Sequence, residues 1–387
     1  MAIDNKDKKV LNVPHLRFPE FTEEWEKCKL GELAVKVGSG STPKGGNAVY
    51  TTSGHCFVRS QNVGMGHLIL NDIAYIDEST HQKQKSTELR TNDVLLNITG
   101  ASIGRTALAT EEINGGNVNQ HVCIIRTNSN VEPSYICDYI QTSKIQKYIQ
   151  SLQTGGSREG LNFEQIRSFP IYIPMVEEQV KISKLLSLIN ERIAIQSKLI
   201  EKLESLIKGL RVSLMQIEDG NIVHLGEIAR IYQPQTISST ELTEDGFLVY
   251  GANGIIGKYK EYNHKTEQIC ITCRGNTCGM VNYTKPMSWI TGNAMVINTD
   301  EHQNKVCKRY LYHYLSAYNF NSIISGSGQP QIVRTPLEQL KVPLPTFLEQ
   351  KQKATFLDKI QGKIEISNKT LNLYLQQKQY LLRQMFI

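Results

Sequence analysis

The chain of 387 residues repeats one pattern at a fixed displacement, and this repeat limits its fold more than any other feature. A proline, a Glu-Gln pair and a long stretch of spaced apolar residues occur near the middle of the chain and again at its end. A shift of 171 positions aligns the two copies without a gap. It superposes Pro174 on Pro345, Glu178 on Glu349, Gln179 on Gln350, Leu186 on Leu357 and Ile193 on Ile364. The sequence therefore predicts two halves built on one plan.

In both copies the apolar residues recur at alternating steps of three and four, which is the spacing of a heptad seam. Each segment spans about 38 residues and would form a helix of roughly 57 Å. Such a helix must bury its apolar stripe, and the nearest partner is the other copy. The predicted seam residues are Leu186, Ile189, Ile193, Gln196, Ile200 and Leu203 in the first helix, and Leu357, Ile360, Ile364, Ser367, Leu371 and Tyr374 in the second.

Polar residues occupy three positions of the predicted seam. Gln196 aligns with Ser367, and Lys378 fills a third slot. If the helices pair antiparallel about their midpoints, Gln196 meets Ser367, and we expect this pair to mark a pseudo-two-fold axis and fix the register. The alternative is that each is a tolerated polar residue at a hydrated point of the seam.

The repeat unit is larger than the helix. The phrase Leu-Gly-Glu-Leu-Ala at residues 30–34 returns as Leu-Gly-Glu-Ile-Ala at residues 225–229, just after the first long helix. Short strand-like runs follow in each copy and end in spaced glycines, which predicts strands joined by exposed glycine loops. These glycines are Gly100 and Gly104 in the first copy and Gly275 and Gly279 in the second.

The fold class that follows is α+β, with two globular mixed α/β domains joined by two long helices that form an antiparallel coiled coil with pseudo-two-fold symmetry. Each domain should contain a shorter helical stretch, at residues 134–152 and 307–324. Thr346 and Glu349 have the spacing of a capping box, whereas Met175 at the matching place cannot cap. The predicted segments are a disordered tail at 1–15, a first domain at 16–174, a long helix at 175–215, a second domain at 216–345 and a long helix at 346–387.

The net charge of +6 resides in the two helices, because residues 177–211 contribute +2 and residues 349–383 contribute +4. The domains are close to neutral, so charge alone does not indicate nucleic acid. No run of about 18 apolar residues and no signal-peptide pattern occurs, and we expect a cytoplasmic protein without membrane contact. The eight cysteines fit a reducing compartment. Cys270, Cys273, Cys278 and Cys307 could suggest zinc, but they do not have the paired CxxC spacing of a zinc site.

The sequence contains no pattern typical of a catalytic or cofactor site. No GxxxxGK[ST] loop, no GxGxxG after a strand and no HExxH occurs. The glycine-rich run at residues 38–43 is followed by no helical pattern and predicts a turn. His55, His121 and His224 lack metal spacing, and structural or surface roles are expected for them. We therefore expect no catalytic residue, cofactor or metal in this chain.

Loops of both domains are rich in side chains that can bind double-stranded DNA. Arg pairs with guanine, and Asn and Gln pair with adenine, in the major groove, while Ser, Thr and glycine-loop amides bind phosphate. Any one of them is more often a turn residue, and only their occurrence in two units on a rigid spacer favours DNA binding. The candidates are Ser41, Lys44, Arg59, Gln61, Asn62, Ser102, Arg105, Asn119, Gln120, His121 and Arg158 in the first domain, and Tyr250, Asn253, Arg274, Asn276, Asn293, Gln329 and Gln331 in the second.

Three features together resemble the specificity subunit of type I restriction-modification enzymes. They are the opening Leu-Arg-Phe-Pro-Glu-Phe with the later Glu-Trp and Leu-Gly-Glu-Leu, the Pro-x-x-x-Glu-Gln start of each long helix, and the alternation of variable domain and helix. The resemblance covers nearly the whole chain. Met175 departs from the usual pattern, in which a small capping residue would be unremarkable.

The resemblance implies two target recognition domains, each binding one half of a split, asymmetric DNA site. It implies that the helices pair antiparallel, set the spacing of the half-sites and dock two modification subunits, which bind S-adenosylmethionine and methylate adenine. Restriction subunits can join this core, and no catalytic residue or cofactor is implied in this chain. Two recognition domains on one rigid helical spacer reach the same face of the duplex when the half-sites lie roughly 10 bp apart, centre to centre.

Two other functions remain open on the sequence alone. A self-contained DNA methyltransferase or endonuclease would need a cofactor-binding glycine loop or clustered carboxylates. A coiled-coil adaptor that joins proteins without contacting DNA would leave the polar loop residues unexplained. Near-neutral domains are compatible with the partner subunits that the resemblance implies, if these help to encircle the DNA and supply phosphate contacts. We therefore expect the isolated chain to bind DNA weakly and to aggregate, because the outer faces of its helices expect partners.

Overall fold

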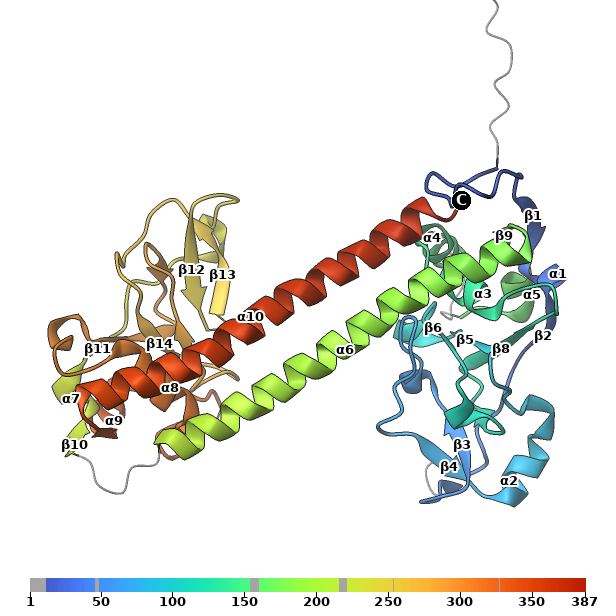
Figure 1. The fold of residues 1–387 in the computed structure, drawn as a ribbon. Helices are drawn as coiled ribbons and strands as arrows, with labels where there is room; N and C mark the ends of the chain where they lie inside the picture. Colours follow the sequence, from blue (N-terminus) through green and yellow to red (C-terminus); the bar gives the residue numbers. More distant parts are fainter. Residues whose placement is uncertain (1–11, 46–48, 154–159, 216–220, 253, 327) are drawn as a thin grey trace, which may run out of the picture. The chain divides into compact units, whose positions relative to one another are not determined.

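The structure is a computed structural model of the chain (Figure 1), and it describes residues 12–45, 49–153, 160–215, 221–252, 254–326 and 328–387. The chain forms two compact units. Unit 1 contains the chain up to Gln196 together with Thr370–Ile387, and unit 2 is Ser197–Lys369. Each unit therefore combines one globular domain with parts of two long helices.

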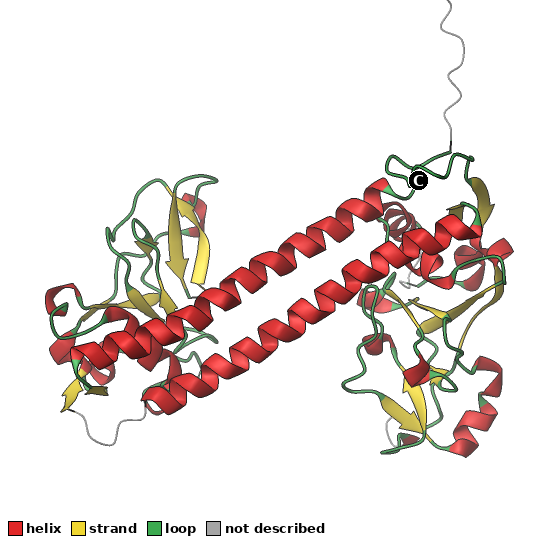
Figure 2. Cartoon of the chain, in the orientation of Figure 1, coloured by secondary structure: helices red, strands yellow, loops and turns green. Residues whose placement is uncertain are grey.

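Unit 1 is a mixed α and β structure (Figure 2). Its elements are β1 Glu26–Lys29, α1 Leu30–Leu33, β2 Ala34–Ser39, β3 His55–Val58, β4 Ala74–Ile76, α2 Glu78–Lys83, β5 Val94–Asn97, β6 Thr106–Leu108, β7 Asn117–Val118, β8 Val122–Thr127, α3 Pro133–Ile140, α4 Ser143–Ser151, α5 Phe163–Arg167 and β9 Pro170–Ile173. One antiparallel sheet has the order β2-β8-β5-β6, and another sheet, β4-β3-β7, contains a parallel β3–β7 pair. The first strand, β1, pairs antiparallel with the last, β9.

Unit 2 repeats this topology strand for strand. Its elements are β10 Asn221–His224, α7 Leu225–Ile228, β11 Arg230–Tyr232, β12 Phe247–Gly251, β13 Gly254–Tyr259, β14 Ile269–Thr272, β15 Val281–Tyr283, β16 Trp289–Ile290, β17 Ala294–Asn298, α8 Lys308–Ala317, α9 Arg334–Glu338 and β18 Lys341–Leu344. The sheets have the orders β11-β17-β14-β15 and β13-β12-β16, with β12 and β16 parallel, and β10 pairs with β18. The repeat therefore includes the middles of the two domains, where the sequences differ.

The repeated Leu-Gly-Glu phrase forms the short helices α1 and α7. Leu30 and Leu225 are fully buried, and each donates its backbone N–H to the carbonyl of a residue that precedes the last strand, at 2.9 Å. A Cβ atom on Gly31 would lie 3.0 Å from the Cβ of Arg167 in α5. The same close approach occurs at Gly226, so the phrase contains glycine because α1 and α7 pack tightly on α5 and α9.

The long helices are α6, Val176–Met215, and α10, Phe347–Gln384. The Gln of each Glu-Gln pair links the start of its helix to the domain. Gln179 donates to the Pro174 carbonyl at 2.8 Å and accepts from the Glu132 N–H at 2.9 Å. Gln350 makes the same two contacts, to Pro345 and Cys307, at 2.9 and 2.8 Å.

The Glu of each pair behaves differently in the two copies. Glu349 accepts from the hydroxyl and N–H of Thr346, at 2.7 and 2.9 Å, which confirms the predicted capping box. Glu178 stands after the non-capping Met175, and its buried carboxylate instead binds Arg17 through two bonds of 2.7 and 2.8 Å. The opening segment of the chain therefore holds the start of α6 by an ion pair that has no counterpart at Glu349 among the described residues of the second copy.

The two long helices contribute to one core within each unit. In unit 1 the core includes Ile182, Leu186 and Ile189 from the first half of α6 and Leu381, Leu382, Met385 and Phe386 from the end of the chain. In unit 2 it includes Ile207 from the second half of α6 and Ala354, Leu357 and Ile364 from the first half of α10. The start of one helix thus packs with the end of the other, as antiparallel pairing requires.

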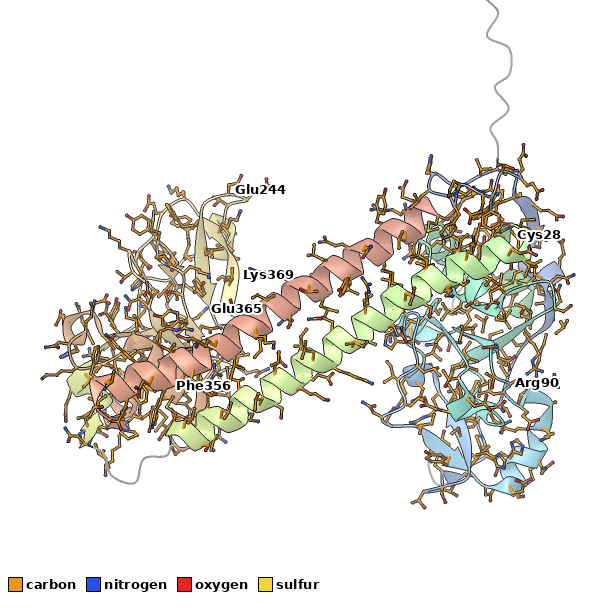
Figure 3. The ribbon with its side chains drawn as sticks, in the orientation of Figure 1. Cys28, Arg90, Glu244, Phe356, Glu365 and Lys369 are labelled. Atoms are coloured by element: carbon orange, nitrogen blue, oxygen red, sulfur yellow. The ribbon has the colours of Figure 1, made fainter. Side chains whose placement is uncertain are left out.

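The other predicted seam residues vary in burial. Ile200 and Ser367 are buried, whereas Ile193, Gln196, Leu203, Ile360, Leu371 and Tyr374 are half-buried. Arg192 lies over the Tyr374 ring, with its guanidinium carbon 6.0 Å from the ring centroid. Phe356 and Lys369 lie along α10 outside this set (Figure 3). Gln196 and Ser367 belong to different units, so their meeting at a pseudo-two-fold axis stays a prediction.

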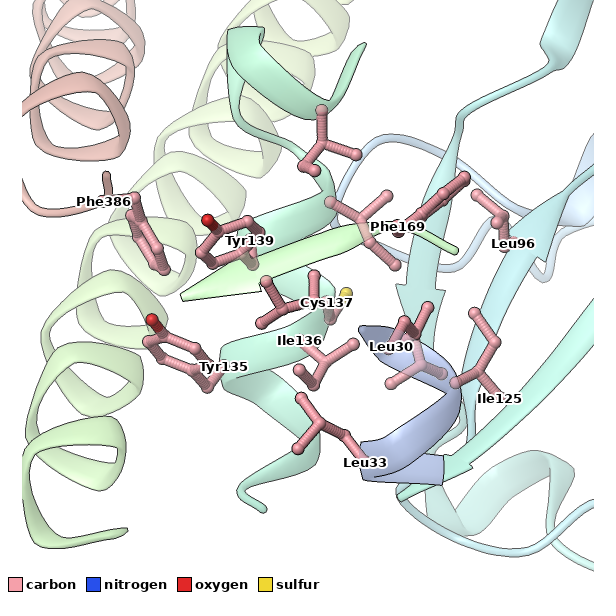
Figure 4. Packing of buried hydrophobic residues seen from close by; sticks show 14 of the residues in the cluster. Leu30, Leu33, Leu96, Ile125, Tyr135, Ile136, Cys137, Tyr139, Phe169 and Phe386 are labelled. Carbon is pink, nitrogen blue, oxygen red and sulfur yellow. The ribbon is translucent and has the colours of Figure 1, made fainter. Parts of the chain in front are cut away.

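The core of unit 1 includes the end of the chain (Figure 4). Phe386 packs against Tyr135 and Tyr139 of α3, with ring centroids 5.3 and 5.5 Å apart. The Tyr139 hydroxyl also donates to the Ile387 carbonyl at 3.1 Å. Aromatic packing and a hydrogen bond therefore anchor the last residues of the chain in unit 1.

Three local expectations need correction. The predicted helix at residues 134–152 is two helices, α3 and α4, because Thr142 leaves the helical path and caps α4 by accepting from the Ile145 N–H. The stretch at residues 307–324 contains α8 and then, after a break at Tyr318, a single 3₁₀ turn at Phe320–Ser322. Of the predicted disordered tail at residues 1–15, residues 1–11 lie outside the described residues, and the Asn12 carbonyl already accepts from the Trp25 N–H at 2.9 Å.

Candidate nucleic-acid interface

The structure brings together loops of unit 1 that contain most of the candidate DNA-binding residues. The loop after β2 contains Ser41 and Lys44, the turn after β3 contains residues 59–62, the β5–β6 loop contains residues 98–105, and the β7–β8 loop contains residues 119–121. These strands are neighbours in two sheets, which places their ends close together. Four segments distant in sequence therefore meet at one polar surface.

A chain of side-chain contacts connects three of these loops. Thr42 contacts Gln120, whose amide lies 3.2 Å from the His121 ring, and the other ring nitrogen of His121 lies 2.5 Å from the Thr99 hydroxyl. The turn after β3 joins them because the amide of Asn97, the last residue of β5, donates to the Ser60 carbonyl at 2.8 Å. Gln120 remains exposed, so this network holds a usable amide at the surface.

The turn after β3 is organised around one carboxylate, that of Asp72. Gln61 contacts the carboxylate of Asp72, Arg59 donates to its backbone carbonyl at 2.6 Å, and the Asn62 amide donates to its carboxylate at 3.0 Å. Arg59 also lies over Tyr50, with 5.6 Å between the guanidinium carbon and the ring centroid. Asp72 offsets the positive charge of Arg59 and fixes its direction.

Not every predicted residue has a side chain that is open to a base. Asn62 is fully buried, and its oxygen accepts from the Arg59 N–H at 3.0 Å, so its amide shapes the turn. Asn119 is also buried, and its oxygen accepts from the His121 N–H at 3.1 Å. Tyr250 in unit 2 is buried too; its hydroxyl accepts from the Lys285 N–H, and burial raises its pKa. The structure gives these three residues structural roles.

The accessible candidates in unit 1 are Ser41, Lys44, Gln61, Arg105 and Gln120, which are exposed, and Arg59, Ser102 and His121, which are half-buried. The remaining candidate, Arg158, lies outside the described residues, as does Asn253 in unit 2.

Unit 2 gathers its candidates on equivalent loops around Cys273. The Cys273 N–H donates to the Asn293 carbonyl and its carbonyl accepts from the Ile332 N–H, both at 3.0 Å. Arg274 forms an isolated bridge with Gln331 across the same junction. The candidates Arg274, Asn276, Asn293, Gln329 and Gln331 are all exposed. Three loops thus present one polar surface, as in unit 1.

Sequence reasoning missed the residues that connect the loops. Thr42, Thr99, Asp72 and Asn97 hold unit 1 together, and Thr272 of unit 2 donates to the Ala252 carbonyl at 2.6 Å. Thr42 stood in a glycine-rich run that predicted only a turn. No local signal identified the others, because each partner lies far away in sequence.

The described residues contain no group of three or more metal-ligating side chains. Within the same part of the chain, no helix is long and apolar enough to cross a bilayer. The surface includes amide, hydroxyl and guanidinium groups, which can form hydrogen bonds with bases and phosphates.

The chain thus contains two domains of the same topology, each with a polar loop surface and each packed with parts of two long helices. A family described as type I restriction modification DNA specificity domain matches residues 22–205 and again residues 217–375. The chain belongs to this family and is a type I restriction-modification specificity subunit with two DNA specificity domains. Specificity subunits of such complexes bind DNA and assemble with other subunits.

Known relatives support this assignment. The chain is 32% identical to the type I restriction enzyme EcoprrI specificity subunit of Escherichia coli over 36% of each chain. It is 23% identical to the type I restriction enzyme MjaVIII specificity subunit of Methanocaldococcus jannaschii over 94% of this chain and 92% of that one. The crystal structure of the type I restriction-modification S subunit from M. genitalium matches with a TM-score of 0.69 and 17% identity, over 97% of this chain and 99% of that one. The shared fold confirms the predicted α+β class.

Proposed function

We propose that this chain recognises a bipartite, asymmetric DNA site, with one half-site bound by each domain. The supporting observation is that equivalent loops of one repeated topology contain different polar side chains. The loop bounded by Gly100 and Gly104 contains Ser102, whereas the equivalent loop bounded by Gly275 and Gly279 contains Asn276. One frame with two sets of donors and acceptors is suited to binding two different base sequences.

We further propose that the long helices dock two methyltransferase subunits. Exposed apolar residues follow each helix at heptad spacing: Leu188 and Ile195 on α6 are 49% and 64% exposed, and Leu373 and Tyr380 on α10 are 63% and 50% exposed. Such a stripe is costly in water unless a further helix covers it. In this proposal the partner subunits bind S-adenosylmethionine and methylate adenine, restriction subunits can join, and this chain is not catalytic.

A reconstitution experiment tests both parts. The chain mixed with its methyltransferase subunits and S-adenosylmethionine should methylate adenine at a defined site, and either component alone should not. DNA retention by the complex should weaken steeply with salt, because phosphate contacts release counterions. Methylation by the chain alone would indicate a self-contained enzyme. A complex that never retains DNA would indicate an adaptor.

A further inference from the structure

The short helices α3 and α8 occupy equivalent places in the two units. Tyr135 and Tyr310 each donate to a backbone carbonyl of the strand that precedes the long helix, at 2.6 and 2.9 Å. Aligning these tyrosines aligns the two helices residue by residue. The alignment places Asp138 of unit 1 at the position of His313 in unit 2. Both side chains are buried, at 5% and 0% exposure, yet their charges differ.

In unit 1 the Asp138 side chain is connected through Gln141 to a cation near the end of α10. Lys378 donates to the Gln141 side chain at 2.8 Å, and Gln141 donates to Asp138 at 3.1 Å. All three residues are buried. Burial raises the pKa of Asp138 to about 7, and the charge of Lys378 opposes this shift. We call these three side chains the unit 1 polar contact.

In unit 2 the side chain at the same position, His313, contacts a different group of charged residues. One ring nitrogen of His313 accepts from Arg211 of α6 at 3.2 Å, and the other lies 2.8 Å from the carboxylate of Asp358 in α10. Arg309 binds the same carboxylate at 2.8 and 3.0 Å. Burial lowers the pKa of His313, and the bond to Asp358 opposes this shift. We call these four side chains the unit 2 polar contact.

Neither polar contact could form if the two helix ends were exchanged. The 171-residue repeat places an apolar or uncharged residue opposite each charged member contributed by a long helix. Ile207 and Leu382, which take two of these places, are buried in their own cores at 4% and 2% exposure. The corresponding positions are Lys378 with Ile207, Arg211 with Leu382 and Asp358 with Ser187.

We infer that these two unlike polar contacts select which long-helix end each domain accepts, so that each half of the chain pairs with the other half and not with a second copy of itself. If residues 197–215 were seated on the first domain, Ile207 would face Asp138 and leave its carboxylate without a cation. Arg211 would then take the place of Leu382 among apolar side chains. Buried charges without partners are strongly unfavourable, so the sequence disfavours this pairing.

The inference can be tested by cleaving the folded full chain between its repeats. A protease site introduced at residues 216–220 allows the purified protein to be cut after folding, and native mass spectrometry then counts the complexes that the two fragments form. We expect one-to-one complexes of the two different fragments. A statistical mixture with dimers of one fragment, or separation into monomers, would overturn the inference.

A transplant variant gives the sharper test. Ile207→Lys with Arg211→Leu gives the end of α6 the residues that α10 presents to Asp138. Dimers of the first fragment should then increase by about tenfold or more. The matched control is Ser205→Lys with Lys208→Leu, which makes a similar change at exposed positions of the same helix and should leave the distribution unchanged. Equal distributions in variant and control would contradict the inference.

A second variant decides the matter if the transplant does not fold. Asp138→Asn with Lys378→Met removes the unit 1 polar contact while keeping the side chains close in size. The first fragment should then also form dimers with itself, because Ile207 no longer faces a carboxylate. Exclusive pairing of unlike fragments in this variant would show that the polar contact does not select the partner.

Discussion

At the residue scale, His313 links the stability of unit 2 to pH. Its buried ring is held neutral, because one nitrogen accepts from Arg211 and burial lowers its pKa. The unfolded chain binds a proton more readily, so stability should be lost as pH falls below about 6.5. Unfolding midpoints between pH 5 and 8 should therefore decline more steeply with acid in the wild type than in His313→Gln. Identical slopes in the wild type and in His313→Gln would contradict this role for His313.

The Glu-Gln pairs offer a second prediction at this scale, with a control built into the repeat. Glu178→Gln should leave the half-buried Arg17 without the buried carboxylate that binds it and lower the free energy of unfolding by about 3 kcal/mol. Glu349→Gln changes an exposed cap and should have a much smaller effect. Denaturant titration of both variants measures the difference. Equal losses would contradict the role assigned to Arg17.

These pairs also show what sequence can reveal about single residues. The repeat identified both Glu-Gln pairs, and the Thr346 cap was predictable because its partner is three residues away. The ion pair of Glu178 was not predictable, because Arg17 lies 161 residues away. The same reason applies to the polar loops: residue types indicated candidates, but burial of Asn62 and Asn119 depends on distant strands.

At the scale of elements, α1 packs closely on α5 because Gly31 has no side chain. Gly31→Ala would place a Cβ atom 3.0 Å from that of Arg167, so Arg167 must move away by a few tenths of an ångström. We expect a loss of about 1–3 kcal/mol in the free energy of unfolding. Gly209→Ala on α6 is the control, because beyond its own helix backbone no described atom lies within 4 Å of the added carbon, and it should be neutral or stabilising. A neutral Gly31→Ala would refute the packing argument.

Element boundaries were predictable where the signal was periodic and uncertain where a side chain broke it. The long helices have sustained apolar spacing, and the sequence indicated them directly. The break between α3 and α4 depends on Thr142, a residue type that favours caps but also occurs inside helices, so it did not mark a boundary by itself. Strand pairing such as β1 with β9 joins residues more than 140 positions apart and leaves no local trace.

At the scale of the whole molecule, the repeat of topology exceeds the repeat of sequence. The Leu-Gly-Glu phrases and the long helices repeat in sequence. The sheets between them repeat only in strand order and in the placement of loop glycines. Packing constrains the frame, and exposed loops are free to vary. Two domains with one architecture and different surfaces are what recognition of two unlike half-sites requires.

The most direct test maps methylated adenines on a random DNA library treated with the reconstituted complex, using the wild type and an Arg274→Ala, Gln331→Ala variant. The account predicts two short specific sequences separated by a fixed, non-specific gap. In the variant, one half-site should be relaxed and the other kept, because only unit 2 has changed. One continuous recognition sequence, or equal relaxation of both halves, would contradict it.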